Sequence, residues 1–155
     1  DHVDLGDPAS EQAHNLAASS HSGTNVEAGL TRRYTNVSYP GGWFEFDLAV
    51  DPGASFILRA IETYDQAQLK DYEVLVDGQV VHTRHHRRTD GGAGTVTYQF
   101  VVDLPEATRD GVVRVRFQDT GDGYDPSIAD VWSIPMAAGS NASDPAPAAS
   151  GPVGP

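Results

Sequence analysis

A tyrosine is followed directly by an aspartate at two places in this sequence, Tyr64-Asp65 and Tyr124-Asp125. In both places an apolar segment borders a polar connection. A flat aromatic face can pack against the apolar side of a sugar ring, while carboxylate, amide or guanidinium groups bind the hydroxyls. These residue types therefore favour carbohydrate recognition by loops.

Three further residues extend this candidate site. Arg33 and Tyr34 lie in a long polar segment, and Trp43 begins the next apolar segment on its polar face. An aromatic side chain can equally seal a sheet edge or close a loop, so each one also has a purely structural interpretation. The predicted ligand-binding residues are Arg33, Tyr34, Trp43, Tyr64, Asp65, Tyr124 and Asp125.

A second candidate site is a Gly-rich acidic loop containing Asp119, Asp122 and Asp125. Calcium is a hard cation that binds several oxygen ligands, and such a loop can supply them. The spacing matches no known calcium motif, and acidic turn residues are ordinary in a chain with 22 Asp and Glu. Structural calcium is therefore one of two readings of this loop.

The histidines of the segment His82 to Arg88 do not form a convincing zinc site. Zinc needs three or four convergent ligands. On a strand, His85 and His86 would point to opposite faces, and the chain has no cysteine. With Arg87 and Arg88 adjacent, this segment is better read as a solvated basic patch.

Composition argues against several classes of function. The net charge of -12 disfavours nucleic acid and anionic membrane surfaces, since both attract Lys and Arg. No apolar run approaches the roughly 20 residues that span a bilayer. The sequence has no Gly-x-Ser-x-Gly, phosphate-loop or His-Glu-x-x-His motif, so we expect no enzymatic activity from this chain alone. The first residues lack the basic and apolar regions of a signal peptide, which suggests a domain taken from a longer protein.

The elements that would position these residues are strands. Residues 43–50 alternate apolar and polar side chains, as expected of a strand with one buried face. Further strands are expected at 56–63, 95–102, 112–117 and 128–134, and a hairpin at 72–83 around the Asp77-Gly78 turn. That turn would pair Val74 with Val81 and Leu75 with Val80. The 10–18 segment fits either a short helix or an edge strand.

This pattern predicts an all-β fold, a single jelly-roll-like β-sandwich of about eight antiparallel strands. The sandwich would span residues 1–136. Residues 137–155 are rich in Ala, Ser, Gly and Pro and should form a disordered linker. The predicted core comprises Phe44, Phe46, Leu48, Phe56, Leu58, Val74, Val96, Tyr98, Phe100, Val113, Val115 and Phe117.

Four segments together resemble a known accessory domain: Asp1-x-Val3-x-x-Gly6, Ser10-Glu11-x-x-His14-Asn15-Leu16, Gly41-Gly42-Trp43-Phe44-x-Phe46-Asp47-Leu48, and Tyr72-x-Val74-Leu75-Val76-Asp77-Gly78. They are similar to the β-sandwich found after the catalytic domain in bacterial glycoside hydrolase family 127, the β-L-arabinofuranosidase-like enzymes. More loosely, the layout resembles carbohydrate-binding modules with a galactose-binding-like sandwich, such as families 6 and 35.

The resemblance implies a non-catalytic, secreted accessory domain that binds plant-type glycans weakly and adjoins a catalytic domain of the same chain. The looser resemblance implies loop aromatics that hold sugars, and structural calcium for which Glu11 and Asp130 would be further oxygen donors. The sequence departs from this pattern in the polar segment from Ser19 to Tyr39 and at His85-His86-Arg87-Arg88.

Two alternatives remain. The domain could be a structural sandwich that only supports a catalytic domain, or it could contribute to a glycosidase active site, which needs two carboxylates beside a cleft. A binding module should gather at least two of Trp43, Tyr64 and Tyr124 beside polar groups in one depression. A supporting domain should spread them over a flat patch.

Overall fold

Alternating apolar and polar residues form eleven strands within residues 1–137, the part of the 155-residue chain that this computed structural model describes. The predicted linker covers residues 137–155, and all of it except Ala137 lies outside the described residues. The elements are β1 (His2–Asp4), α1 (Pro8–Ala13), β2 (Ala17–Ala18), β3 (Gly23–Glu27), β4 (Leu30–Tyr34), β5 (Trp43–Ala49), β6 (Phe56–Tyr64), β7 (Gln68–Val76), β8 (Gln79–Arg88), β9 (Gly94–Val102), β10 (Val112–Asp119) and β11 (Ser127–Pro135).

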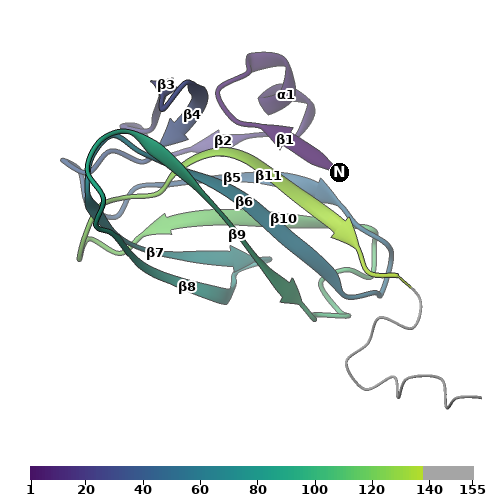
Figure 1. Cartoon of the computed structure of the whole chain (residues 1–155). Coiled ribbons are helices and arrows are strands. Elements are labelled where there is room, and N and C mark those ends of the chain that lie inside the picture. The colour runs from purple at the N-terminus through teal and green to yellow at the C-terminus, as the bar shows by residue number, and fades with distance from the viewer. Residues whose placement is uncertain (138–155) are drawn as a thin grey trace, which may run out of the picture.

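The strands form two antiparallel sheets packed as a sandwich (Figure 1). One sheet has the order β3-β4-β11-β6-β9, with β1 added beside β11, and the other has the order β2-β5-β10-β7-β8. The predicted all-β sandwich is confirmed. The additional strands come from the first 34 residues, where the sequence pattern gave only weak signals. Within residues 1–137 no helix is long and apolar enough to cross a membrane.

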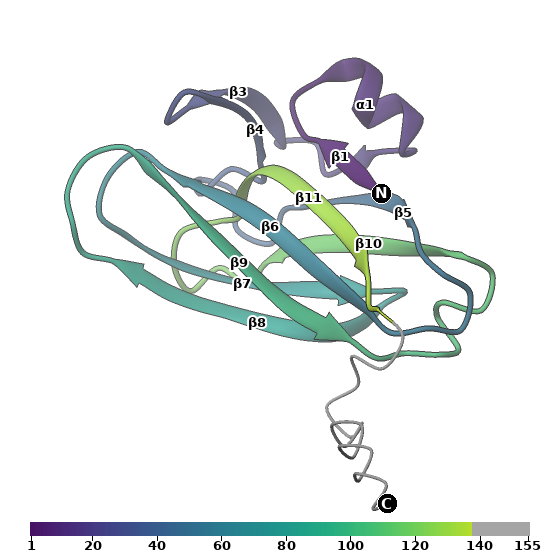
Figure 2. The same ribbon diagram turned by 45° about the vertical axis from the view of Figure 1, so that its right-hand side comes forward.

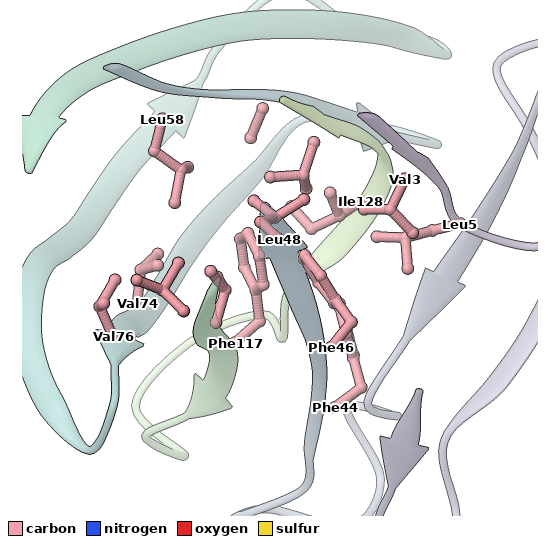
Figure 3. Packing of buried hydrophobic residues seen from close by; sticks show 14 of the residues in the cluster. Val3, Leu5, Phe44, Phe46, Leu48, Leu58, Val74, Val76, Phe117 and Ile128 are labelled. Atoms are coloured by element: carbon pink, nitrogen blue, oxygen red, sulfur yellow. The ribbon is translucent and has the colours of Figure 1, made fainter. Parts of the chain in front are cut away.

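The core lies between the two sheets and contains most of the side chains predicted for it. Figure 3 shows Phe44, Phe46 and Phe117 grouped beside Val74 and Val76, and all five are fully buried. Three predicted core residues, Val96, Tyr98 and Phe100, are only half-buried. The reason is that β9 is the edge strand of its sheet, so its inward face is covered incompletely.

The β7–β8 hairpin turns at Asp77-Gly78, and both residues have positive φ, as expected. Leu75 pairs with Val80 as predicted, but the predicted Val74–Val81 pair is wrong. Val74 pairs with His82, because a β-bulge adds a residue to β8 at this point. The shift turns His82, Arg84, His86 and Arg88 toward the sandwich interior, while Thr83, His85 and Arg87 are exposed.

The N-terminal segment contains both elements that its sequence allowed. Residues Pro8–Ala13 form the short helix α1, capped by Asp7, whose side chain accepts a hydrogen bond from the Ser10 N–H. Residues Ala17–Ala18 then form the edge strand β2. Figure 2 shows α1 beside the β3–β4 hairpin on one side of the sandwich.

Strand register fixes which connections meet. The ends of β4, β6, β8 and β10 and the starts of β5, β7, β9 and β11 all fall at one end of the sandwich, at the left of Figure 1. The connections 35–42, 65–67, 89–93 and 120–126 therefore share this end. Three of the four carry residues from the predicted binding set or lie directly beside them.

Candidate functional site

A polar hollow of about 300 Å³ opens at this end of the sandwich. We call it the Tyr124 hollow. Of the seven residues predicted to bind ligand, Tyr34, Asp65, Tyr124 and Asp125 line it. The other lining residues are Glu27, Arg32, Asn36, Val37, Gln68 and Lys70. Two aromatic side chains, three carboxylates and two cations thus converge on one depression.

Tyr34 reaches the hollow because β4 is a strand and not the loop predicted from its polar sequence. Successive side chains of a strand point to opposite faces, so Arg32 and Tyr34 share one face and Arg33 points away. The Arg32 guanidinium lies 4.4 Å from the centre of the Tyr34 ring. The ring passes over Gly23 so closely that a Cβ there would lie 2.4 Å from the phenolic oxygen. Contacts with Arg32 and Gly23 therefore fix the position of Tyr34.

Tyr124 is positioned by a loop that lies directly against β7. The Tyr124 N–H donates to the Leu69 carbonyl oxygen at 2.9 Å, and the Asp71 N–H donates to the Tyr124 carbonyl oxygen at 3.1 Å. This close approach needs glycine at position 123, where a Cβ would meet Asp71 Cβ at 2.9 Å. Gln66 donates to the Tyr124 hydroxyl at 3.4 Å. The aromatic group is thus fixed at both its backbone and its tip.

Lys70 and Gln68 contribute buried polar groups to the wall of the hollow. Lys70 is 2% exposed and Gln68 is 6% exposed. Lys70 Nζ donates to the Asp125 carbonyl oxygen at 3.1 Å; that is its single hydrogen bond within residues 1–137, although an ammonium carries three donors. Gln68 Nε2 donates to Asp65 Oδ1, and Gln68 Oε1 has no partner among the described residues. Buried polar atoms are normally paired, so Gln68 Oε1 and the remaining donors of Lys70 depart from the usual pattern.

The environment of Lys70 combines burial with opposing charges. Burial lowers the pKa of Lys70, while the carboxylates of Asp125, Glu62 and Glu27 act in the opposite direction. Its ammonium also lies 5.2 Å from the centre of the Tyr64 ring. Tyr64 is fully buried, so it supports the wall of the hollow beneath Lys70 and has no exposed ring face. Its prediction as a ligand-stacking residue is therefore wrong.

A buried carboxylate, Glu62, anchors the side chains behind this wall. It is fully buried and accepts hydrogen bonds from Tyr64 at 2.6 Å, Tyr72 at 2.5 Å and Arg84 at 2.8 Å. Tyr98 joins the cluster through the Tyr72 hydroxyl at 2.8 Å. Burial, and then the Glu62 charge, raise the pKa values of Tyr64, Tyr72 and Tyr98. The network is structural support for the hollow.

The loop carboxylates Asp119 and Asp125 fasten the connection 35–42 to the sandwich. Asp125 Oδ2 accepts from the N–H groups of Thr35 and Asn36, at 3.0 and 2.8 Å. Asp119 Oδ2 accepts from the Gly41 N–H at 3.2 Å. Burial raises the pKa of Asp119, although hydrogen bonds from Gly121 and Gly41 oppose the shift. Both ends of the connection are thus held by carboxylates.

The predicted calcium ligands do not converge. Glu11 accepts two hydrogen bonds from Arg33, both at 2.8 Å, and Asp130 pairs with His2. Within residues 1–137 no group of three or more His, Asp or Glu side chains is placed to hold a metal ion. Asp119 and Asp125 are occupied by backbone N–H groups, and Asp122 is exposed. These side chains therefore do not fit a calcium ion in this arrangement.

Besides Tyr64, two predicted ligand-binding residues are absent from the lining of the Tyr124 hollow, Arg33 and Trp43. Arg33 ties β4 to α1 through Glu11. Trp43 lies on the outer face of the other sheet, where the Arg116 guanidinium covers its ring at 4.1 Å. Of Trp43, Tyr64 and Tyr124, only Tyr124 therefore presents a ring to the hollow, and the second exposed ring there belongs to Tyr34. The prediction that a binding module would gather at least two of these three side chains in one depression is therefore wrong.

Six residues of the hollow were missed from the sequence: Glu27, Arg32, Asn36, Val37, Gln68 and Lys70. Asn36 and Val37 lie in the connection 35–42, and the other four lie on strands. Glu27 and Arg32 lie on β3 and β4, which are too polar to read as strands. Gln68 and Lys70 precede the recognised strand segment but continue its inward face, since Gln68, Lys70, Tyr72, Val74 and Val76 are all buried. A lysine at an inward position of an alternating strand is the signal that could have identified them.

Comparisons with solved structures show carbohydrate-binding modules of the same fold. A family 35 carbohydrate-binding module from Clostridium thermocellum matches with a TM-score of 0.58 and 11% identity, over 84% of this chain and 95% of that one. A family 35 module from Paenibacillus barcinonensis matches with a TM-score of 0.56 and 13% identity, over 88% and 98%.

A part of a larger enzyme chain is also similar. The exo-β-1,3-galactanase of Phanerochaete chrysosporium, whose structure contains β-1,3-galactotriose, matches with a TM-score of 0.56 and 12% identity, over 85% of this chain but 28% of that one. No family model matches the sequence. No curated protein matches it either. At these identities the likeness establishes the fold.

Proposed function

We propose that this chain is a non-catalytic carbohydrate-binding module that holds a glycan in the Tyr124 hollow. The observation that carries the proposal is that Tyr34 and Tyr124 line the same hollow as two buried polar groups. These groups are the Lys70 ammonium, which makes one hydrogen bond, and Gln68 Oε1, which makes none among the described residues. A sugar hydroxyl both donates and accepts, so neighbouring hydroxyls can bind the lysine donor and the glutamine acceptor together. The two aromatic rings supply the apolar surface that a sugar ring needs.

The carboxylates of the hollow support a binding role over catalysis. Asp125 is committed to the backbone of Thr35 and Asn36. Glu27 pairs with Arg32 at 3.1 Å and accepts from Thr63 at 2.8 Å. A glycosidase needs one carboxylate to act as acid and another to act as base or nucleophile. Groups already held in such bonds serve that chemistry poorly.

The wider setting is also part of the proposal. We infer an accessory domain of a larger secreted glycoside hydrolase, of the family 127 type suggested by the N-terminal and Gly-Gly-Trp-Phe segments. The similar region in the exo-β-1,3-galactanase, which occupies 28% of that chain, supports such an arrangement. A purely supporting role would leave the remaining donors of Lys70 and the unpaired Gln68 Oε1 without a use.

A glycan screen tests the proposal directly. The full chain would be tested by affinity electrophoresis and calorimetry against β-1,3-galactan, arabinan and other plant polysaccharides. The ligand concentrations must be high enough to detect a millimolar dissociation constant, which corresponds to a binding free energy of about -4 kcal/mol. Tyr124→Ala should weaken binding about tenfold, the effect of losing one stacked ring. Val112→Ala is the control, since Val112 is 48% exposed at the opposite end of the sandwich. Absence of binding to every glycan would refute the proposal.

A further inference from the structure

A second hollow, of about 410 Å³, adjoins the first and has an exposed aromatic residue at its edge. We call it the Tyr39 hollow. Its lining includes Tyr39 and His21 together with Thr35 and Ser38. Tyr39 is 49% exposed, and nothing described so far gives this ring a role. The ring is available on the surface beside several hydroxyl groups.

The Tyr39 ring has a defined orientation. It stacks on the His21 imidazole, with ring centroids 3.5 Å apart and an angle of 5° between the planes. Since one face lies against His21 and about half of the residue is exposed, the other face is open to solvent. A flat aromatic surface that is fixed in advance binds a sugar ring at a lower entropic cost than a mobile one.

Tyr39 is also close to the Tyr124 hollow. Its N–H donates to the Asn36 carbonyl oxygen at 3.0 Å, the hydrogen bond of a β-turn, which places the two Cα atoms within about 7 Å of each other. Asn36 lines the Tyr124 hollow. Residues of this single turn therefore line both hollows, Asn36 and Val37 the first, and Ser38 and Tyr39 the second.

The turn between the hollows is held firmly. Asp125, which lines the first hollow, binds the N–H groups of Thr35 and Asn36. Asn36 adopts a positive φ of 87° and its side chain accepts from the Ser38 N–H at 3.1 Å. Beyond the turn, Gly41 is bound by Asp119. Tyr39 is thus fixed relative to Tyr124 by carboxylates of the same loop that carries Tyr124.

From this arrangement we infer that Tyr39 is a second sugar-stacking subsite, so that the site binds an oligosaccharide across both hollows and not one sugar unit alone. The inference rests on the proposed function of the Tyr124 hollow. One ring would pack between Tyr34 and Tyr124, and the next along the chain would cross Val37 to the open face of Tyr39. Val37 is 45% exposed and lines the first hollow, which gives this path an apolar surface.

The dependence of affinity on chain length tests the inference. Calorimetry would compare galactose, β-1,3-galactobiose and β-1,3-galactotriose on the full chain, on Tyr39→Ala and on Tyr39→Phe. We expect the trisaccharide to bind wild type about tenfold more tightly than galactose, from one additional stacked ring. Tyr39→Ala should abolish this gain and leave galactose affinity unchanged, whereas Tyr39→Phe should retain it. Val112→Ala, with a similar exposure of 48%, is the matched control.

The possible results separate the inference from the proposed function. Equal affinity for galactose and galactotriose, or a Tyr39→Ala variant that binds galactotriose as wild type does, would overturn the second subsite and leave the first intact. Loss of galactose binding in Tyr124→Ala, together with loss of the galactotriose gain alone in Tyr39→Ala, would support both. Absence of binding of all three sugars by the wild-type chain would overturn the inference. Thermal unfolding of Tyr39→Ala at the wild-type temperature would show that the variant is folded.

Discussion

Burial of the Lys70 ammonium costs folding free energy, and the same group is a candidate donor to a ligand in the Tyr124 hollow. A buried ammonium with one hydrogen bond loses much of its hydration. Such a group persists in a fold when function requires it, and replacing it by an apolar side chain of similar size removes the cost of burying its charge. Stability and binding should therefore respond to this residue in opposite directions.

Lys70→Met tests that opposition. We expect the free energy of unfolding, measured in urea, to stay equal or to rise. Glycan affinity should fall at least about tenfold, because a hydrogen bond from a charged donor contributes about 1.5 to 3 kcal/mol. A variant that is clearly less stable yet binds glycan as wild type does would show that Lys70 serves only the fold.

The tyrosines around Glu62 predict a loss of stability at high pH. Burial and the Glu62 charge raise the pKa values of Tyr64, Tyr72 and Tyr98 above the ordinary value of 10.0. Above pH 10 the unfolded chain releases these protons and the folded chain keeps them, so stability falls as the pH rises. The pKa of Lys70 is lowered from 10.5. Its titration therefore raises stability with pH, but only below pH 10.5.

Urea midpoints between pH 9 and pH 11.5 measure this effect, with Glu62→Gln as the comparison. Wild type should lose stability most steeply above pH 10.5. Glu62→Gln should be less stable at pH 7, by about 3 kcal/mol for breaking a buried ion pair with Arg84, and its pH dependence should be weaker. A wild-type midpoint that does not change between pH 9 and pH 11.5 would contradict the role given to Glu62.

At the scale of elements, the 120–126 connection places Tyr124 only because it packs directly on β7. Gly123→Ala would introduce a Cβ 3.0 Å from the Leu69 carbonyl oxygen and 2.9 Å from Asp71 Cβ, so the loop must move away. We expect a loss of stability of about 1 to 3 kcal/mol and weaker glycan binding. Gly91→Ala is the matched control, since a Cβ there meets nothing within 4 Å. Equal binding by both variants would show that the loop position does not matter.

The strands with strong alternation were predictable, and those that build the site were less so. β5 and β10 follow a strict period of two, and their inward residues are all buried. β3 and β4 have few large apolar side chains, because they form a hairpin at the edge of the sheet with much of their surface exposed. Their Ala28-Gly29 turn, with positive φ at both residues, was the available signal. Without β4, the alternation that separates Arg32 from Arg33 could not be seen.

The loop aromatics were predicted in part for the same reason. Tyr124 and Asp125 were identified from their types, and the structure brings them to the hollow. Tyr64, at the end of β6, occupies an inward position and is covered by Lys70 near the start of β7 and by Arg88 at the end of β8. The sequence alone does not show that these side chains cover Tyr64. Trp43 was correctly placed on the polar face of its strand, but that face belongs to the outside of the second sheet.

At the scale of the whole molecule, the core and the candidate site depend on different residues. The core residues Phe44, Phe46 and Phe117 stack between the sheets, with Phe46 and Phe117 centroids 6.2 Å apart. The hollow is built at the end of the sandwich from connections and strand ends. Mutations in the core should therefore lower stability without altering the specificity of binding.

Phe46→Ala is the simplest test of the core. The side chain is fully buried, so its truncation should cost about 3 to 5 kcal/mol. Urea unfolding monitored by circular dichroism measures the loss. In buffer without urea, and at a temperature where the variant is folded, its glycan affinity should match that of wild type. A cost below about 1 kcal/mol would mean that Phe46 is not packed as described.

The binding surface should lie at the end of the sandwich, in the Tyr124 hollow. An amide chemical-shift titration of the full chain with glycan locates it. The shifts should change at Tyr34, Asp65, Gln68, Lys70 and Tyr124, which come together only at the end of the sandwich. The outer face around Trp43, Glu45 and Arg116 should remain unaffected. Changes confined to that face, or spread over both sheets without a centre at Tyr124, would contradict the account.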